Sequence, residues 1–175
     1  MQKIFKLIVS IAIAEGAGII GSIFTTPAID GWYAGLGKPW FTPPAWVFAP
    51  VWTILFAMMG VALYLVWETP ASRPRKFIAV LIFFCQLALN VLWSYIFFHV
   101  QSPFEAFLEI IILWLAIAGT IYFFAKISRK AAWLLVPYIL WVSFAAVLNY
   151  NFIYTSMIIN ALPGSSISLP APMAG

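Results

Sequence analysis

Five long apolar stretches divide this chain, and they constrain its fold more than any other feature. Each is 18 to 24 residues long, and they run over Leu7–Phe24, Ala45–Trp67, Phe77–Phe98, Phe104–Ala125 and Ala131–Tyr154. At about 1.5 Å per residue, a helix of that length crosses the roughly 30 Å hydrocarbon core of a membrane. Barrel strands would be shorter and would alternate apolar with polar residues. The sequence therefore predicts an all-α integral membrane protein with five transmembrane helices.

The composition agrees with a lipid environment. Hydrophobic residues make up 65% of the chain, charged residues only 8%, and the mean hydropathy is +1.03. A soluble domain carries about 25% charged residues. The net charge of +4 would suit a nucleic-acid partner, but the charges lie in short clusters between the apolar stretches. We therefore expect a lipid bilayer, and no nucleic acid, as the chain's surroundings.

The chain divides into one membrane domain, residues 1–154, and a flexible tail, residues 155–175, rich in Gly, Pro and Ser. The first apolar stretch contains Glu15 and is not followed by a small-residue cleavage motif, so we interpret it as a membrane helix rather than a signal peptide. The longest connection is Thr25–Pro44, and its prolines and aromatic residues favour an ordered lid. Cys85 lies within an apolar stretch, where we expect it to be buried.

The positive charges predict the topology. Eight of the nine lysines and arginines fall on the side of the N-terminus, and Lys38 alone falls on the other side. Short cytoplasmic loops carry an excess of Lys and Arg. In a plasma membrane, the N-terminus should therefore be cytoplasmic, and the first connection and the C-terminus should be outside.

Polar and aromatic side chains recur every four residues in three of the predicted helices, so each set shares one helix face. The three rows are Gln86, Asn90 and Ser94; Trp52, Phe56 and Gly60; and Pro137, Trp141, Ala145 and Asn149. A polar group within a membrane needs a partner or a cavity. The rows either tie helices together through hydrogen bonds or turn toward one interior cavity, and the pattern alone leaves both readings open.

The ionisable residues do not form a recognisable catalytic or metal-binding motif. Glu15 is the acid deepest within a predicted helix, where it would pair with an amide, be protonated or reach a wet interior. Glu105 and Glu109 share a face at the start of the fourth stretch, its outer end, and we expect them at the membrane interface rather than in acid–base work. His99 has no other His or Cys near it in sequence, so we predict no metal site.

The most specific motif runs from the first connection into the second stretch. It reads WYAGLGKP at residues 32–39, WFTPP at 40–44 and FAPVWT at 48–53. Further motifs are QL at 86–87, LN at 89–90, WS at 93–94, PY at 137–138, a tryptophan at 141, FA at 144–145 and LN at 148–149. Over about residues 5–154 the chain resembles the TspO/MBR family of tryptophan-rich sensory proteins, translocator proteins and peripheral benzodiazepine receptors.

This resemblance implies a five-helix bundle whose interior ligand cavity is capped by the first connection. It implies binding of porphyrins or other tetrapyrroles and of hydrophobic drug-like ligands, with no required cofactor, and a homodimer. The family's ligand-contacting positions correspond to Tyr33, Pro43, Trp52, Phe56, Asn90, Trp93, Ser94, Trp141 and Ala145. The sterol motif of animal members is incomplete here, since no Lys or Arg follows Lys130, so we do not expect sterol recognition through it.

Several functions fit this resemblance. The leading interpretation is a membrane receptor or sensor that binds porphyrins and drug-like ligands, with transport of those ligands as a variant. One alternative is a light- and oxygen-dependent enzyme that degrades porphyrin, in which Trp52 and Trp141 would be the catalytic electron donors. Another is a lipid or sterol transporter. The sequence does not choose between binding, turnover and transport.

The topology can be tested by labelling. In a background in which Cys85 is replaced by alanine, Gln2→Cys should react with a membrane-impermeant maleimide only after the cells are opened. Lys38→Cys should react in intact cells, because the first connection is expected outside. Labelling of Gln2→Cys in intact cells would reverse the assignment.

Overall fold

The computed structural model describes the backbone of residues 1–161 and the side chains of residues 1–155, and within that range it is helical without strands. The helices are α1 (Gln2–Ala28), α2 (Phe48–Glu68), α3 (Arg73–Ser94), α4 (Pro103–Ala125), α5 (Arg129–Leu134) and α6 (Val136–Ala161). Single turns lie at η1 (Ile29–Tyr33), η2 (Ala45–Val47) and η3 (Tyr95–His99). Together they form five segments long and apolar enough to cross a membrane. The predicted all-α fold with five transmembrane helices is confirmed.

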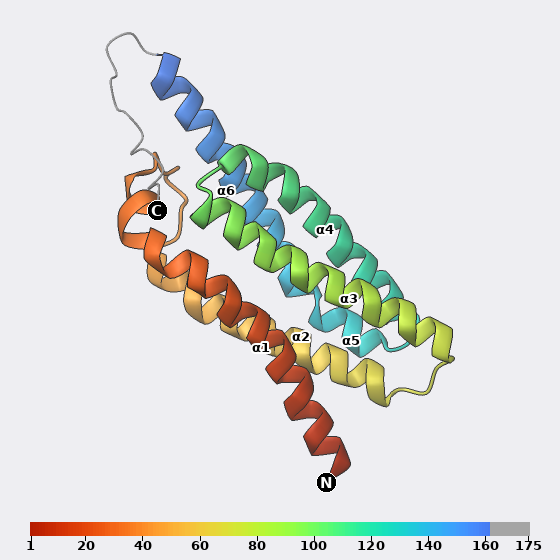
Figure 1. The fold of residues 1–175 in the computed structure, drawn as a ribbon. Coiled ribbons are helices and arrows are strands. Elements are labelled where there is room, and N and C mark those ends of the chain that lie inside the picture. The colour runs from red at the N-terminus through yellow and green to blue at the C-terminus, as the bar shows by residue number, and fades with distance from the viewer. Residues whose placement is uncertain (162–175) are drawn as a thin grey trace.

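The helices form a closed ring. α1 packs on α2 and α3, α3 packs on α4, α4 packs on α5 and α6, and α5 closes the ring on α2. Figure 1 shows the first turns of α1 projecting from one end of this bundle and the last turns of α6 from the other. We call the end that carries Met1 and the connections 69–72 and 126–128 the basic end. The end that carries the connections 34–44 and 100–102 is the loop end.

The first connection begins later than the sequence predicted. α1 and the π-helical turn η1 continue the helix to Tyr33, so the expectation of a loop from Thr25 was wrong over its first nine residues. Tyr33 is only 5% exposed, and its ring packs against Phe97, Phe98 and Phe152. Burial of this aromatic ring outweighs the Gly and Pro signals, because packing overrides weak local propensity.

The fifth membrane segment is broken where the sequence predicted one continuous helix. α5 ends at Leu134 and α6 begins at Val136, with Leu135 in a turn between them. Pro137 has no backbone N–H to donate to Trp133, so the regular hydrogen-bond ladder cannot continue through this point. Leu135 instead donates its N–H to the Ala132 carbonyl at 3.1 Å. The break lets α5 pack on α2 while α6 follows α4.

α6 extends to Ala161, so the boundary expected at residue 155 falls inside a helix. The rest of the expected flexible tail, residues 162–175, lies outside the described residues. Cys85 is exposed on α3, and the expectation that it is buried was wrong. In a membrane bundle an apolar outer surface faces lipid, so an apolar stretch does not distinguish a buried position from an outward one.

α1 and α2 approach most closely toward the basic end. A Cβ atom on Gly60 would lie 2.5 Å from the Ile11 Cα atom and 2.9 Å from the Ser10 carbonyl oxygen. Both neighbours are backbone atoms, so only glycine fits here. One step toward the loop end, a Cβ atom on Gly18 would lie 2.5 Å from the ring of Phe56. Small residues therefore allow the two helices to pack closely, as in other membrane bundles.

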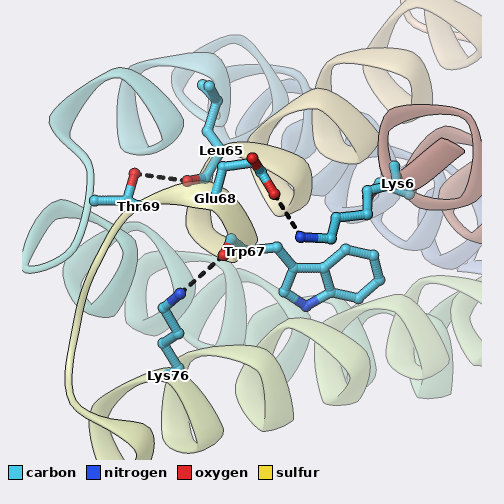
Figure 2. Close-up of polar contacts among 7 residues, drawn as sticks. Lys6, Leu65, Trp67, Glu68, Thr69 and Lys76 are labelled. Atoms are coloured by element: carbon cyan, nitrogen blue, oxygen red, sulfur yellow. Dashed lines mark hydrogen bonds and ion pairs between the residues drawn. The ribbon is translucent and has the colours of Figure 1, made fainter. Parts of the chain in front are cut away.

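Polar contacts at the basic end satisfy the last turn of α2 (Figure 2). The Lys6 ammonium of α1 contacts the Glu68 carboxylate at 2.7 Å. The Lys76 ammonium of α3 donates to the Trp67 carbonyl at 2.8 Å, and the Thr69 hydroxyl donates to the Leu65 carbonyl at 2.7 Å. Carbonyls at a helix C-terminus can lack partners within the helix, so the bonds from Lys76 and Thr69 help to cap α2. An exposed ion pair such as Lys6–Glu68 contributes at most about 1 kcal/mol.

The glycine contact between α1 and α2 can be tested by substitution. Gly60→Ala should destabilise the protein by about 1–3 kcal/mol, because its methyl group would overlap the backbone of Ile11. Gly16→Ala is the matched control, since no atom lies within 4 Å of its added Cβ, and it should be neutral or stabilising by up to about 1 kcal/mol. Thermal unfolding followed by circular dichroism measures both. Equal midpoints for the two variants would contradict the close contact.

Candidate functional site

A cavity of about 280 Å³ lies in the half of the bundle nearer the loop end. Its walls come from α1, the start of α2, the end of α3 and α6, with η1 and η3 above. α6 packs closely on α4, and its other side faces α2 and α3 across large aromatic side chains. Bulky indole and phenyl rings keep these helices apart at one end, whereas α5 closes the bundle at the other. The cavity therefore lies beyond the break between α5 and α6, where α6 and not α5 forms the wall.

Eight of the nine site residues predicted from the sequence line this cavity. They are Tyr33, Trp52, Phe56, Asn90, Trp93, Ser94, Trp141 and Ala145. Pro43 does not line it and lies in the connection before η2. Seven of the ten residues in the three helical rows thus line one interior space, whereas Gln86, Gly60 and Pro137 do not. The seven do so because α2, α3 and α6 each turn the corresponding face inward.

An aromatic cluster closes the cavity toward the loop end. Tyr33, Leu36, Phe97, Phe98 and Phe152 are each at most 9% exposed and pack together. The Lys38 ammonium lies 4.5 Å from the centre of the Tyr33 ring, a cation–π contact. The connection is therefore ordered at its start, in line with the expected lid. Trp40, by contrast, is 96% exposed and does not contribute to this packing.

Hydrogen bonds between helices fix the cavity wall. The Asn90 amide of α3 donates to the Tyr138 hydroxyl of α6 at 3.0 Å. The Trp93 indole N–H donates to the Asn149 side-chain carbonyl at 3.3 Å, and the Asn149 amide donates to the Pro103 carbonyl at 2.7 Å. Such bonds contribute about 0.6–2 kcal/mol each in membrane bundles. The polar rows therefore serve both readings left open by the sequence, since Asn90, Trp93 and Asn149 tie helices together and also line the cavity.

Two buried donors that line the cavity have no hydrogen-bond partner among the described residues. They are the Tyr33 hydroxyl and the Trp141 indole N–H. A buried donor without a partner costs about 1–3 kcal/mol. Both groups can donate to acceptor atoms of a molecule within the cavity. The Trp52 and Phe56 rings, with centroids 5.6 Å apart, add flat apolar surface to the same wall.

Glu15 also lines the cavity, although the sequence did not single it out as a site residue. Its spacing from Gly18, Ile19 and Ser22 puts these four residues on neighbouring positions of one side of α1, and all four line the cavity. Small residues on α1 also allow close helix packing. Gly18 and Gly21 do approach α2 and α3 closely, at Phe56 and Ser94, and the same face forms a cavity wall.

Two other expectations about ionisable residues have different outcomes. Glu105 is exposed, whereas Glu109 is 6% exposed with both carboxyl oxygens lacking a partner among the described residues. Glu109 is thus buried within the bundle while Glu105, one turn earlier, is exposed, and their expected place at the membrane interface stays a prediction. His99 stacks on Tyr95 with ring centres 5.0 Å apart. Among the described residues, no group of three His, Cys, Asp or Glu side chains is arranged to hold a metal ion.

Comparison with known proteins identifies the family. The model of the TspO/MBR family matches residues 10–155. The chain belongs to the TspO/MBR family. It is 43% identical to the tryptophan-rich protein TspO of Archaeoglobus fulgidus over 149 residues, 85% of this chain and 95% of that protein. It is 42% identical to the Chlorobaculum tepidum protein of the same name over 152 residues, 87% of this chain and 96% of that protein. It is 39% identical to the human translocator protein over 132 residues, 75% of this chain and 78% of that protein.

The role of Asn149 in the cavity wall of this TspO/MBR protein can be tested. Asn149→Ala should lower stability by about 1–4 kcal/mol, because it removes two interhelical bonds and leaves the half-buried Trp93 indole N–H without its partner. Asn151→Ala is the matched control, since its amide bonds only to the Val147 carbonyl of its own helix. Thermal unfolding midpoints measure the difference. A larger loss for Asn151→Ala would contradict the assigned tether.

Proposed function

We propose that this protein is a membrane receptor or sensor that binds porphyrins, other tetrapyrroles and hydrophobic drug-like ligands in the cavity between α1, α2, α3 and α6. The observation that carries the proposal is the convergence of eight family-matching residues on that one cavity. The relatives are named tryptophan-rich protein TspO and translocator protein, and neither name specifies a ligand for this chain. The ligand class is the one that the family resemblance implies, and the aromatic lining of this chain's cavity supports it.

The cavity offers flat aromatic surface to a flat ligand. Trp52, Trp93 and Trp141 line it from three different helices, and Phe48 and Phe56 lie beside them. Offset stacking adds about 0.5–1.5 kcal/mol per aromatic pair beyond the burial of apolar area. Its volume of about 280 Å³ is near the lower limit of ligand cavities, which span roughly 300–1,000 Å³. A macrocycle would therefore have to enter partly and leave one edge outside the walls.

The polar groups suggest an orientation. The free donors of Tyr33 and Trp141 suit ligand acceptor atoms such as ring nitrogens or carbonyl oxygens. Lys38, above the Tyr33 ring, is the cation nearest the closed mouth at the loop end, and it suits the carboxylates of a porphyrin. The cytoplasmic N-terminus and a homodimer remain predictions alongside this binding mode. No cofactor is needed for binding.

Ligand binding can be tested with protoporphyrin in the dark. Ala145→Thr should weaken binding by about 5- to 100-fold, because a β-branched side chain would occupy cavity space at a cost of about 1–3 kcal/mol. Val147→Thr, on the exposed side of the same helix, should bind as the wild type does. The shift of the porphyrin absorbance band and quenching of tryptophan fluorescence measure affinity. Equal affinities for both folded variants would remove Ala145 from the site.

The same preparation separates binding from light-driven degradation, the alternative function. Under illumination, a porphyrin-degrading enzyme would lose turnover in a Trp52→Phe and Trp141→Phe double variant, since phenylalanine is far harder to oxidise than indole, while dark binding persisted. We expect instead that wild type, double variant and empty detergent bleach protoporphyrin at the same rate. Faster bleaching by wild type alone would replace the receptor proposal with the enzymatic one.

A further inference from the structure

The cavity opens sideways between α1 and α2. Ile19 and Ser22 of α1 and Thr53 of α2 line the cavity, and all three are also exposed on the outer surface. Residues that line the cavity and are also exposed on the outer surface lie at the rim of an opening. Toward the basic end the opening closes where Gly60 of α2 meets the backbone of Ile11. Because α1 and α2 are membrane-crossing segments, the surface around this opening faces lipid.

Glu15 lies at the inner limit of this opening. Ile11, one turn earlier on α1, meets Gly60 of α2, so Glu15 lies on the side of α1 that faces α2. Ile19 follows one turn later, on the rim. On the other walls, the lining residues nearest the basic end are Phe56, Asn90 and Trp141. Glu15, which is half-buried, therefore lines the floor, the end of the cavity nearer the basic end, and lies near the middle of its membrane segment.

Among the described residues, the cavity lining offers a negative charge and no positive one. Glu15 is the only Asp, Glu, Lys, Arg or His among the described residues that line the cavity. In the described part of the chain, it has no ion pair, since the one salt bridge joins Lys6 to Glu68 at the basic end. A carboxyl group near the middle of a membrane is costly unless it has a partner, and such residues commonly mark ligand or ion sites. The Trp141 indole N–H on the same floor is a free donor.

We propose that Glu15 is the residue that selects the ligand, and that the opening between α1 and α2 takes molecules from the membrane that carry a hydrogen-bond donor or a positive charge. This inference rests on the proposed binding function and specifies the chemistry of its deep end. An ionised carboxylate can only accept hydrogen bonds, so Glu15 would bind a ligand group that donates one, such as an ammonium or N–H group. A ligand carboxylate on the floor would meet like charge and be disfavoured.

For a tetrapyrrole, this selection determines which edge enters. The carboxylate-bearing edge stays away from Glu15, toward Lys38, and the edge without charge enters first. For smaller ligands it predicts a preference between molecules of the same shape. An apolar amine should bind more tightly than the matching alcohol, and the alcohol more tightly than the matching acid.

The test uses three probes that share one flat ring system: pyrenebutylamine, pyrenebutanol and pyrenebutyric acid. The full-length protein is placed in nanodiscs of phosphatidylcholine, and energy transfer from tryptophan to pyrene gives the affinities. We expect wild type to bind the amine at least about tenfold more tightly than the acid. Glu15→Gln keeps the size and an acceptor oxygen but not the charge, and it should bring the amine within about twofold of the alcohol. Glu105→Gln, an exposed acid outside the cavity, is the matched control and should keep the wild-type order.

The outcomes separate this inference from the proposed function. Wild-type protein that binds protoporphyrin but shows no preference for the amine would overturn the role of Glu15 and leave the receptor proposal standing. Wild-type protein that prefers the amine but does not bind protoporphyrin would leave the role of Glu15 standing and overturn the porphyrin-binding proposal. An unchanged preference in folded Glu15→Gln, checked by circular dichroism and size-exclusion chromatography, would also overturn the role of Glu15. The wild-type order decides the matter even where a variant fails to fold.

Discussion

The close approach of α1 to α2 at Gly60 determines the geometry of the cavity. Because a Cβ atom there would meet the backbone of Ile11, the two helices touch main chain to main chain toward the basic end. Toward the loop end the gap between α1 and α2 is no longer closed by small residues, and there Ile19, Ser22 and Thr53 form a rim.

The opposite wall depends on a second constraint, the break before Pro137. It lets α5 pack against α2 while α6 continues along α4 and away from α2. Aromatic side chains occupy the widened space, and Trp52 contacts Tyr138 with ring centres 6.2 Å apart. In a bilayer, lipid is as apolar as these rings, so burial gives little drive to close the space. Specific hydrogen bonds, such as Asn90 to Tyr138, hold the wall in register instead.

Much of the fold and the site could be predicted from the sequence. The five membrane segments follow from the length of the apolar stretches, and the three rows on α2, α3 and α6 follow from four-residue spacing. Apolar length says less about where a helix ends, so α1 and α6 both exceed their expected limits. It says nothing about which side faces lipid, because both the core and the surface of a membrane bundle are apolar. Cys85 was misplaced for that reason.

The sequence by itself determined that the chain crosses a membrane five times and that its polar and aromatic residues lie in helical rows. Both properties are local, since they depend on the rise and period of a single helix. Only the tertiary structure decided that these rows meet in one cavity, that Pro43 lies outside it, and that Glu15 belongs to it. Those outcomes depend on the order of helices in the ring and on the two points where the backbone comes close or breaks. None of these outcomes can be obtained from the pattern of one helix, because all of them depend on contacts between residues far apart in the chain.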